Sequence, residues 1–411
     1  MPLKMGWSIN PVKIYVGAKG SALILSFGFS IIYSRLLGLE NKSVLTFIFT
    51  VSSLLILGFI SSLGLTLRKR ISNASNERVE IVYYLKKLLS LTFILSVLFI
   101  SLLITYSVFV THLNYKIFAL SLFLFITSSI VQGFNELMIG IDRLRTISLI
   151  ENIEILVQLI LFFTISKLVG FSIIISVMLA ISITYTFSAI VILRLVFIHT
   201  KEYARDSIRF DSSSANDFKF FDSSSLYTIL PFVVLDRIDK ILIGFLLPLV
   251  SLSKYAVLLV FFSLVRFIPE SISKTFFSRH QIRDANREPN LKFILITSIA
   301  ASLVAYPLYV ICMGFLLGKN WILPLGIFLA VAVFELARAI YLLQINRQFA
   351  ENLETGFKIT HIPWFIGMAV VLACISVHFV GLIGVPLSFA LTYVTLIIKG
   401  KNWANRLART I

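Results

Sequence analysis

A group of charged residues stands inside an apolar segment near the middle of the chain. Residues 236–240 read Asp-Arg-Ile-Asp-Lys, with apolar residues on both sides. Asp236 and Lys240 are four residues apart, so on a helix they share a face and can form an ion pair. Each charge at the centre of a membrane helix costs roughly 2.5–3.5 kcal/mol on insertion scales. We therefore favour a functional role for these four charges over internal pairing that serves only packing.

Two other apolar segments carry charges at helical spacing. Arg266 and Glu270 are four residues apart, and Pro269 stands beside the glutamate. A proline frees a backbone carbonyl one turn earlier and kinks a helix, which suits a helix that lines a cavity or acts as a hinge. Glu335 and Arg338 are three residues apart. We expect these charges and those of residues 236–240 to line one aqueous cavity.

Polar residues at the ends of apolar segments are weaker indicators of a functional site. Lys19 and Arg35 lie near the two ends of the first segment, where each could extend to a membrane interface as readily as line a cavity. A further set is interpreted as solvated helix ends at the cytoplasmic boundary. This set comprises Gln132, Asn135, Glu136, Glu151, Asn152, Glu154 and Gln158.

The composition of the chain indicates a membrane protein. Of the 411 residues, 58% are hydrophobic and 14% are charged, and the mean hydropathy is +0.94. A soluble domain is about a quarter charged. The apolar runs are about 20 residues long, which is the length that one bilayer crossing requires. The expected fold class is therefore an all-α integral membrane protein, with no metal, no organic cofactor and no cysteine-based site.

We predict about twelve transmembrane helices. The expected spans are 14–38, 43–66, 88–110, 117–139, 148–168, 171–196, 223–248, 254–277, 292–316, 322–345, 359–378 and 381–398. The longest polar stretch, 199–222, is a candidate cytoplasmic linker between an N-terminal six-helix lobe (1–198) and a C-terminal six-helix lobe (223–411). Two such bundles with a substrate site between them are a recurring transporter plan.

The basic residues orient these helices. Most of the 37 Lys and Arg residues lie in the two ends of the chain and in the loops after the even-numbered spans. The opposite loops hold one basic residue each at most: Lys42, Lys116, Lys167, Lys254 and Lys319. Because basic loops stay in the cytoplasm, both termini are predicted to be cytoplasmic. The formal net charge of +17 then needs no nucleic-acid partner.

An enzyme is not expected. The sequence contains no HExxH, P-loop, GxSxG or DxD motif, and the outer loops are short. A membrane polymerase or transferase of lipid-linked glycan would need one large outer loop with clustered polar residues. We therefore assign no catalytic residue.

Several short motifs resemble one transporter family. They are Lys19-Gly20, Tyr33 to Gly38, Ser62 to Leu65, Asp236 to Gly244, and Ser253 to Ala256. These resemble the first, second, seventh and eighth helices of Wzx-type polysaccharide flippases, within the multidrug/oligosaccharidyl-lipid/polysaccharide (MOP) exporter superfamily. The resemblance implies a V-shaped pair of lobes in the bacterial inner membrane. It also implies that undecaprenyl-diphosphate-linked oligosaccharide, such as an O-antigen repeat unit, is flipped to the periplasmic face by alternating access through a cationic cavity.

The resemblance also implies roles for the charges within the spans. Residues expected to bind the diphosphate and sugar are Lys19, Arg35, Arg237, Lys240, Arg266 and Arg338. Residues expected to couple transport to an ion gradient are Asp236, Asp239, Glu270 and Glu335. Expected partners are the lipid-linked oligosaccharide and the bilayer, and glycan polymerase and chain-length machinery are further candidates.

Two other transporter functions stay open. A drug or metabolite antiporter of the same superfamily would favour cationic substrates and would need unpaired carboxylates, whereas cations outnumber acids in these spans. A flippase for the peptidoglycan precursor would use similar chemistry, although such relatives often have helices beyond twelve.

Overall fold

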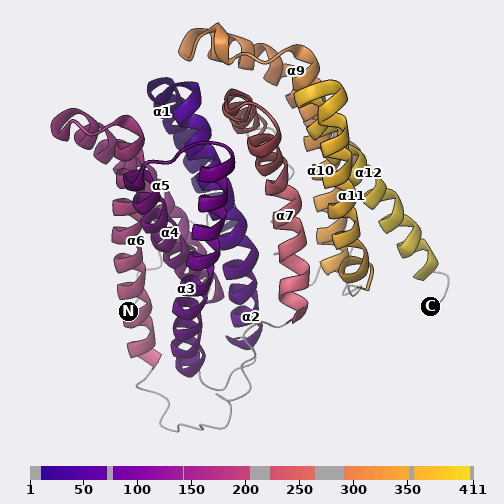
Figure 1. Cartoon of the computed structure of the whole chain (residues 1–411). Coiled ribbons are helices and arrows are strands. Elements are labelled where there is room, and N and C mark those ends of the chain that lie inside the picture. The colour runs from indigo at the N-terminus through magenta and orange to yellow at the C-terminus, as the bar shows by residue number, and fades with distance from the viewer. Residues whose placement is uncertain are drawn as a thin grey trace.

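The structure is a computed structural model, and it describes residues 11–71, 77–141, 143–203, 223–263, 291–350 and 356–407. Over these residues it is a bundle of long helices without strands (Figure 1). The helices are α1 (Pro11–Leu55), α2 (Ser61–Ile71), α3 (Glu77–Phe109), α4 (Tyr115–Gly140), α5 (Leu144–Thr164), α6 (Ile173–Tyr203), α7 (Ser223–Leu246), α9 (Leu291–Leu316), α10 (Leu325–Ala350), α11 (Gly356–Val380) and α12 (Gly384–Leu407). A further helix covers Leu249–Ser263. The all-α prediction is confirmed.

The length and hydropathy of the helices fit a membrane. Six described stretches are long and apolar enough to cross a bilayer. Two of them, Gly20–Arg68 and Trp364–Lys399, have 49 and 36 residues, well above the about 20 that one crossing needs. Helices are expected here because hydrocarbon offers no partner for the backbone, so each segment must satisfy its own N–H and C=O groups.

The first long stretch is broken at a glycine. Gly38 has φ 72° and ψ 178° inside α1, a left-handed φ that favours glycine. The break falls at the predicted end of the first span, but the chain resumes helix at once instead of forming the expected loop before residue 43. The second span then continues through a π-helical turn (Ile56–Ile60) into α2.

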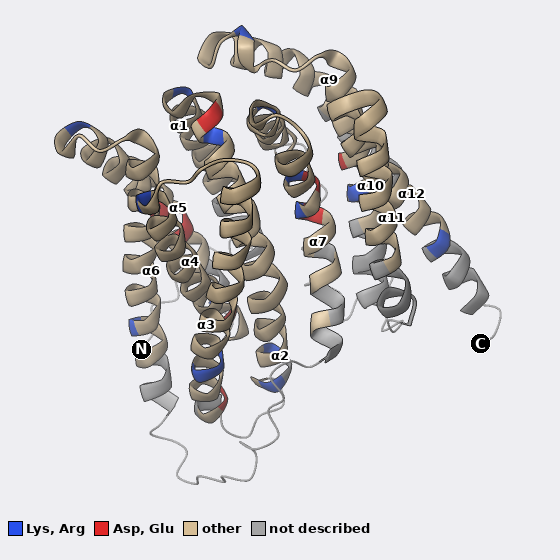
Figure 2. Ribbon diagram, in the orientation of Figure 1, with Lys and Arg blue, Asp and Glu red and all other residues tan. Residues whose placement is uncertain are grey.

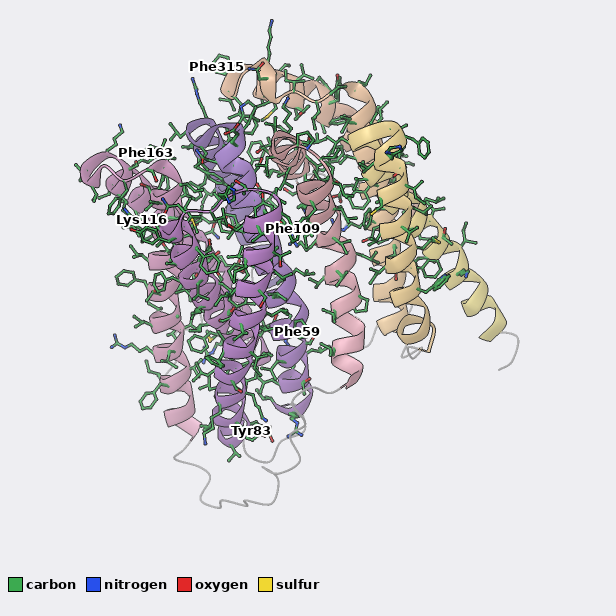
Figure 3. All side chains as sticks on the ribbon, in the orientation of Figure 1. Phe59, Tyr83, Phe109, Lys116, Phe163 and Phe315 are labelled. Carbon is green, nitrogen blue, oxygen red and sulfur yellow. The ribbon has the colours of Figure 1, made fainter. Side chains whose placement is uncertain are left out.

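The outer surface of the bundle is apolar. Phe109 and Phe315 are 78% and 85% exposed, and Figure 3 shows them with Phe163 on the outside of the helices. A soluble monomer rarely exposes apolar patches this large. This surface is suited to contact with lipid.

Helix α7 lies between two groups of helices. Helices α4, α5 and α6 pack together with α1, and α10, α11 and α12 pack together on the other side. Helix α7 contacts α1 and α2 as well as α11 and α12, and Figure 1 shows it in the middle of the bundle. Helix α6 continues to Tyr203, beyond the start of the predicted linker at 199, and residues 204–222 lie outside the described residues. The division into lobes at 1–198 and 223–411 stays a prediction.

Candidate functional site

A cavity of about 770 Å³ lies between the two groups of helices. Its lining comes from α1, α4, α5, α6, α7, α10 and the helix at Leu249–Ser263. This volume is within the range of ligand-binding cavities. The charged residues of its lining are Lys42, Glu151, Glu154, Arg237, Asp239, Lys240, Glu335 and Arg338.

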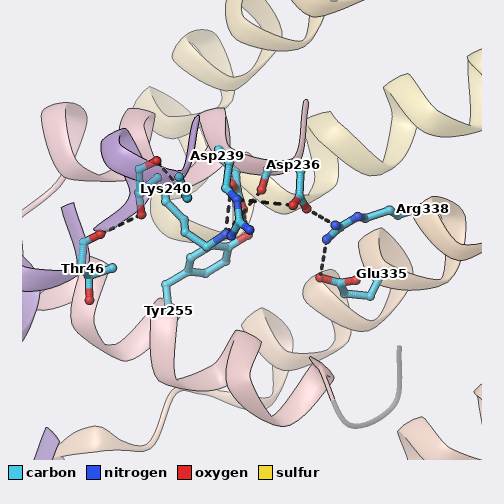
Figure 4. Close-up of polar contacts among 10 residues, drawn as sticks. Thr46, Asp236, Asp239, Lys240, Tyr255, Glu335 and Arg338 are labelled. Carbon is cyan, nitrogen blue, oxygen red and sulfur yellow. Dashed lines mark hydrogen bonds and ion pairs between the residues drawn. The ribbon is translucent and has the colours of Figure 1, made fainter. Parts of the chain in front are cut away.

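A buried ion-pair network joins α7 to α10 on one wall of the cavity. The Arg338 guanidinium forms an ion pair with the Asp236 carboxylate, and its Nη1 lies 3.4 Å from Glu335 Oε1. Figure 4 shows Arg338 between these two carboxylates, and Figure 2 shows the charges of α7 and α10 at the same height in the bundle. Arg338 and Glu335 are 7% and 6% exposed. Removing one member of such a buried pair is expected to destabilise the fold strongly.

Asp239 holds the second part of this network. Its carboxylate is 1% exposed and accepts a hydrogen bond of 2.8 Å from the Tyr255 hydroxyl. Lys240 Nζ lies 3.9 Å from Asp239 Oδ1 and donates to the backbone oxygen of Asp236 at 3.4 Å. Arg237 Nε lies 3.5 Å from Asp236 Oδ2.

The predicted ion pair between the side chains of Asp236 and Lys240 is therefore wrong. The Asp236 carboxylate pairs with Arg338 and Arg237, and Lys240 pairs with Asp239. The reason is tertiary, because α10 brings the guanidinium of Arg338 to Asp236. A guanidinium presents several donors in a plane and suits a buried carboxylate better than an ammonium does.

Lys42 is a cavity residue that the sequence analysis assigned to an outer loop. It is 4% exposed, its Nζ donates to the Tyr33 hydroxyl at 2.8 Å, and it lies 4.0 Å from the centroid of the Tyr33 ring. Both residues line the cavity. Lys42 is not in a loop because the helix is interrupted only at Gly38 and then continues, so Lys42 lies inside the helical segment that follows. The sequence did contain a signal that Lys42 lies within a helix: residues 39–57 contain neither proline nor glycine.

The opposite wall carries carboxylates and amides. Gln132 and Asn135 of α4, and Glu151, Glu154 and Gln158 of α5, line the cavity. Glu154 and Gln158 are 8% and 7% exposed. Their interpretation as solvated helix ends is wrong, because α4 and α5 turn these side chains toward the cavity. We call these five residues the acid–amide wall, and the α7–α10 network with Tyr255 the ion-pair wall.

Glu136 is also buried, at 5% exposure, although it too was interpreted as a solvated end. Its carboxylate pairs with Arg68 of α2 and accepts a hydrogen bond of 3.1 Å from Gln132 Nε2. It follows that this end of α4 is fixed to α2 by charge.

The outcome for the ten predicted site residues is mixed. Six of them lie together at the cavity. Asp236 pairs with Arg338, and five residues line the cavity as predicted: Arg237, Asp239, Lys240, Glu335 and Arg338. Arg35 is exposed and lies outside the cavity lining. Lys19 lies on α1, but its side chain is outside the described part of the structure, and so are Arg266 and Glu270.

The described lining contains four basic and four acidic side chains. The cationic character of the cavity therefore stays a prediction that depends on Lys19 and Arg266. Among the described residues, no group of three or more His, Cys, Asp or Glu side chains is placed to hold a metal ion.

Two serines join α1 to the helix at Leu249–Ser263, at the predicted outer end of the cavity. Ser43 Oγ donates to the backbone oxygen of Leu249, Ser253 Oγ donates to that of Leu39, and the two hydroxyls are 2.6 Å apart. Both serines are fully buried. Each serine follows its own leucine by four residues, and each leucine follows a helix break, at Gly38 or Pro248. We call this contact the serine crossing.

Comparisons with known proteins give a family and a fold. The family described as "Polysaccharide biosynthesis protein" matches residues 11–276. No curated protein matches the sequence. The lipid II flippase MurJ in an inward closed conformation is similar in structure, with TM-score 0.72, 16% identity, and coverage of 96% of this chain and 87% of that one.

Two transporters of the MOP superfamily are also similar. An inward-facing multidrug resistance MATE family transporter gives TM-score 0.64 at 12% identity, covering 97% and 99% of the two chains. A transporter from Pyrococcus furiosus, described as having a binding pocket of reverse polarity, gives 0.60 at 11% identity, covering 96% and 94%. At these identities the likeness shows a shared fold.

Proposed function

The chain belongs to the polysaccharide biosynthesis protein family, and from this premise we propose that it flips a lipid-linked glycan. The proposed substrate is an undecaprenyl-diphosphate-linked oligosaccharide, such as an O-antigen repeat unit. The proposed direction is from the cytoplasmic to the periplasmic leaflet of the bacterial inner membrane. The observation that carries this proposal is the cavity between the halves, with basic side chains from α1, α7 and α10.

The two walls of the cavity suit the two parts of such a head group. Arg237, Lys240 and Arg338 supply charge-assisted donors for a diphosphate. The acid–amide wall supplies acceptors and donors for sugar hydroxyls. The polyprenyl tail stays in the bilayer, which requires a lateral opening between the halves.

A diphosphate would compete with carboxylates that already contact the arginine. Arg338 is shared by Asp236 and Glu335 in the structure. A phosphate that binds Arg338 releases one of these carboxylates, which can then take up a cation or a proton. In this way Asp236 and Glu335, with Asp239 and Glu270 as further candidates, would couple binding to an ion gradient.

We propose that the serine crossing closes the outer end of the cavity in this conformation, before substrate binds. With the outer end closed, the head group enters from the cytoplasmic side. Release requires the Ser43 and Ser253 contacts to separate as the halves rock. Alternating access of this kind is the common mode of two-lobed transporters.

A second candidate function is export of cationic compounds. Glu151 and Glu154 favour it, because both carboxylates line the cavity. The two functions differ in the charge of the ligand, so one set of variants separates them.

The test is complementation of a strain that lacks its own O-unit flippase, with surface glycan measured on gels. Wild type is expected to restore glycan when the matching glycan genes are supplied. Arg338→Ala and Arg237→Ala are expected to abolish it at equal membrane levels, and Arg35→Ala, at an exposed site outside the cavity, serves as the matched control.

Two results would redirect the proposal. Failure of the wild type to restore glycan, together with resistance to toxic cations that Glu154→Gln removes, would replace it with cation export. Full activity of both arginine variants would remove these arginines from the substrate path.

A further inference from the structure

A second hollow lies on the other face of α4, away from the cavity. It has a volume of about 300 Å³, roughly ten times the share of one water molecule in the liquid. Helix α4 forms its floor, and α3 and α6 form its walls. All eight lining residues are apolar: Leu85, Leu88, Leu89, Ile130, Phe134, Ala189, Ile190 and Leu193. We call this hollow the apolar groove.

The apolar groove faces the lipid on the cytoplasmic side. Its residues come from the first part of α3 and the last parts of α4 and α6, next to the loops predicted to be cytoplasmic. Leu89, Ile190 and Leu193 are 62%, 59% and 45% exposed. Figure 3 places Tyr83, two residues before Leu85, at one end of the bundle.

The groove is built into the packing of α3 on α4. The Tyr84 hydroxyl donates to the Gly133 backbone oxygen at 2.9 Å. A Cβ added at Gly133 would lie 2.4 Å from the Leu88 side chain, so a larger residue there would require Leu88 to move. The contact between α3 and α4 beside the hollow is therefore close.

Basic residues stand at the edge of the groove. Lys86 and Lys87 lie between groove residues on α3, and Arg194 follows Leu193 on α6. Lys86 and Arg194 are exposed, and Lys87 Nζ lies 5.4 Å from the Tyr83 ring. Glu80, one turn before on the same helix, is engaged by Arg70 at 3.5 Å. Side chains of this kind extend from apolar surface to the head-group region.

We propose that the apolar groove binds an acyl chain of an anionic phospholipid from the cytoplasmic leaflet, with its phosphate held by Lys86, Lys87 and Arg194. An apolar groove accounts for the chain, and the three basic side chains account for the head group. Basic pockets between helices on the cytoplasmic side are suited to anionic lipids. The site is separate from the transport cavity, because α4 lies between them, and the proposal does not depend on the substrate of the cavity.

The test is native mass spectrometry of the full-length protein in detergent, titrated with phosphatidylglycerol or phosphatidylcholine. Wild type is expected to bind phosphatidylglycerol preferentially. The triple variant Lys86→Gln, Lys87→Gln, Arg194→Gln is expected to weaken phosphatidylglycerol binding by about tenfold or more. The matched control is Lys116→Gln, Lys167→Gln, Lys319→Gln, which removes the same charge from exposed residues at the opposite end of the bundle and is expected to bind like wild type.

A second variant tests the groove without changing charge. Ala189→Trp fills the hollow and is expected to weaken the binding of both lipids, while the triple glutamine variant, which leaves the packing untouched, weakens only phosphatidylglycerol. Equal phosphatidylglycerol binding by wild type, triple variant and Ala189→Trp would overturn the proposal.

Two further outcomes would assign the groove to another occupant. Undecaprenyl phosphate that displaces phosphatidylglycerol from wild type, and binds the triple variant as tightly as wild type, would make the groove a site for the polyprenyl tail. A wild-type dimer that Ala189→Trp converts to monomer would make it an interface between copies. Either result overturns the phospholipid assignment.

Discussion

The two walls of the cavity hold their charges in different ways. On the ion-pair wall, Arg338, Asp236 and Glu335 contact one another directly, and Asp239 contacts both Tyr255 and Lys240. On the acid–amide wall, the carboxylates of Glu151 and Glu154 lie among the amides of Gln132, Asn135 and Gln158. Fixed opposite charges resist rearrangement, whereas amides can donate or accept. We therefore propose that the ion-pair wall fixes the geometry of the site and that the amides of the other wall provide adaptable hydrogen bonding.

The largest effect is expected from the centre of the ion-pair wall. Arg338→Ala removes the guanidinium that Asp236 and Glu335 share, and loss of one partner of a buried pair costs about 3–5 kcal/mol. We expect a fall of this size in the free energy of unfolding, measured by denaturant titration in detergent. Arg35→Ala, at an exposed site, is expected to leave the unfolding free energy unchanged. An equally stable Arg338→Ala protein would show that this wall is not fixed by its charges.

The next effect concerns Lys42, a buried lysine of α1 in the cavity lining. Tyr33→Phe removes the hydroxyl that accepts from Lys42. A hydrogen bond to a charged group contributes about 1.5–3 kcal/mol, and we expect a loss of that size in the same titration. Tyr115→Phe, at a residue 76% exposed, is the control. If Tyr33→Phe left the free energy of unfolding unchanged, the hydrogen bond to Tyr33 would not be what holds Lys42 in place.

A smaller effect is expected at the serine crossing. Ser43→Ala and Ser253→Ala each remove one hydroxyl-to-carbonyl hydrogen bond, worth about 1 kcal/mol, and the contact between the two hydroxyls. We expect more outward opening, measured as faster labelling of Thr46→Cys by a membrane-impermeant thiol reagent from the periplasmic side, in a background without Cys312 and Cys374. Ser101→Ala, whose hydroxyl donates to the backbone oxygen of Val97 in the same helix, should label like the parent. Unchanged labelling in both crossing variants would mean that other contacts close this end.

The smallest effect on stability is expected on the acid–amide wall. Glu154→Gln keeps the shape and hydrogen-bonding capacity of the side chain, so we expect a change below about 1 kcal/mol together with altered transport of different glycans. Asp239→Asn is the counterpart on the ion-pair wall and should cost about 1.5–3 kcal/mol, because Tyr255 and Lys240 both contact its charge. Equal costs at the two positions would remove the proposed difference between the walls.

Much of the fold could be predicted from hydropathy, because a span must be apolar over about 20 residues and its flanks mark its ends. The predicted second span, 43–66, is an example: helix covers it, with a π-helical turn at Ile56–Ile60. The charges of residues 236–240 also stood out, since charge in an apolar run is rare.

Pairing between distant segments could not be predicted in the same way. In the sequence, Lys240 is the evident partner of Asp236, four residues away. In the structure, Asp236 pairs with Arg338 because α10 packs beside this part of α7. Glu154 and Gln158 are polar near a segment end, which a solvated surface and a cavity wall explain equally well in sequence. Their burial follows from the tilt and contacts of α5, which are tertiary properties.

The serine crossing contains no ionisable group. Each of its two hydroxyls donates to a backbone carbonyl on the other helix, and the hydroxyls also lie 2.6 Å apart, so separating α1 from the helix at Leu249–Ser263 breaks all of these contacts. Because hydrogen bonds between neutral groups depend little on pH or ionic strength, the serine crossing itself is not expected to respond to either. In the proposed flippase, we therefore expect opening at this contact to follow ligand binding in the cavity rather than a change of pH or salt outside the cell.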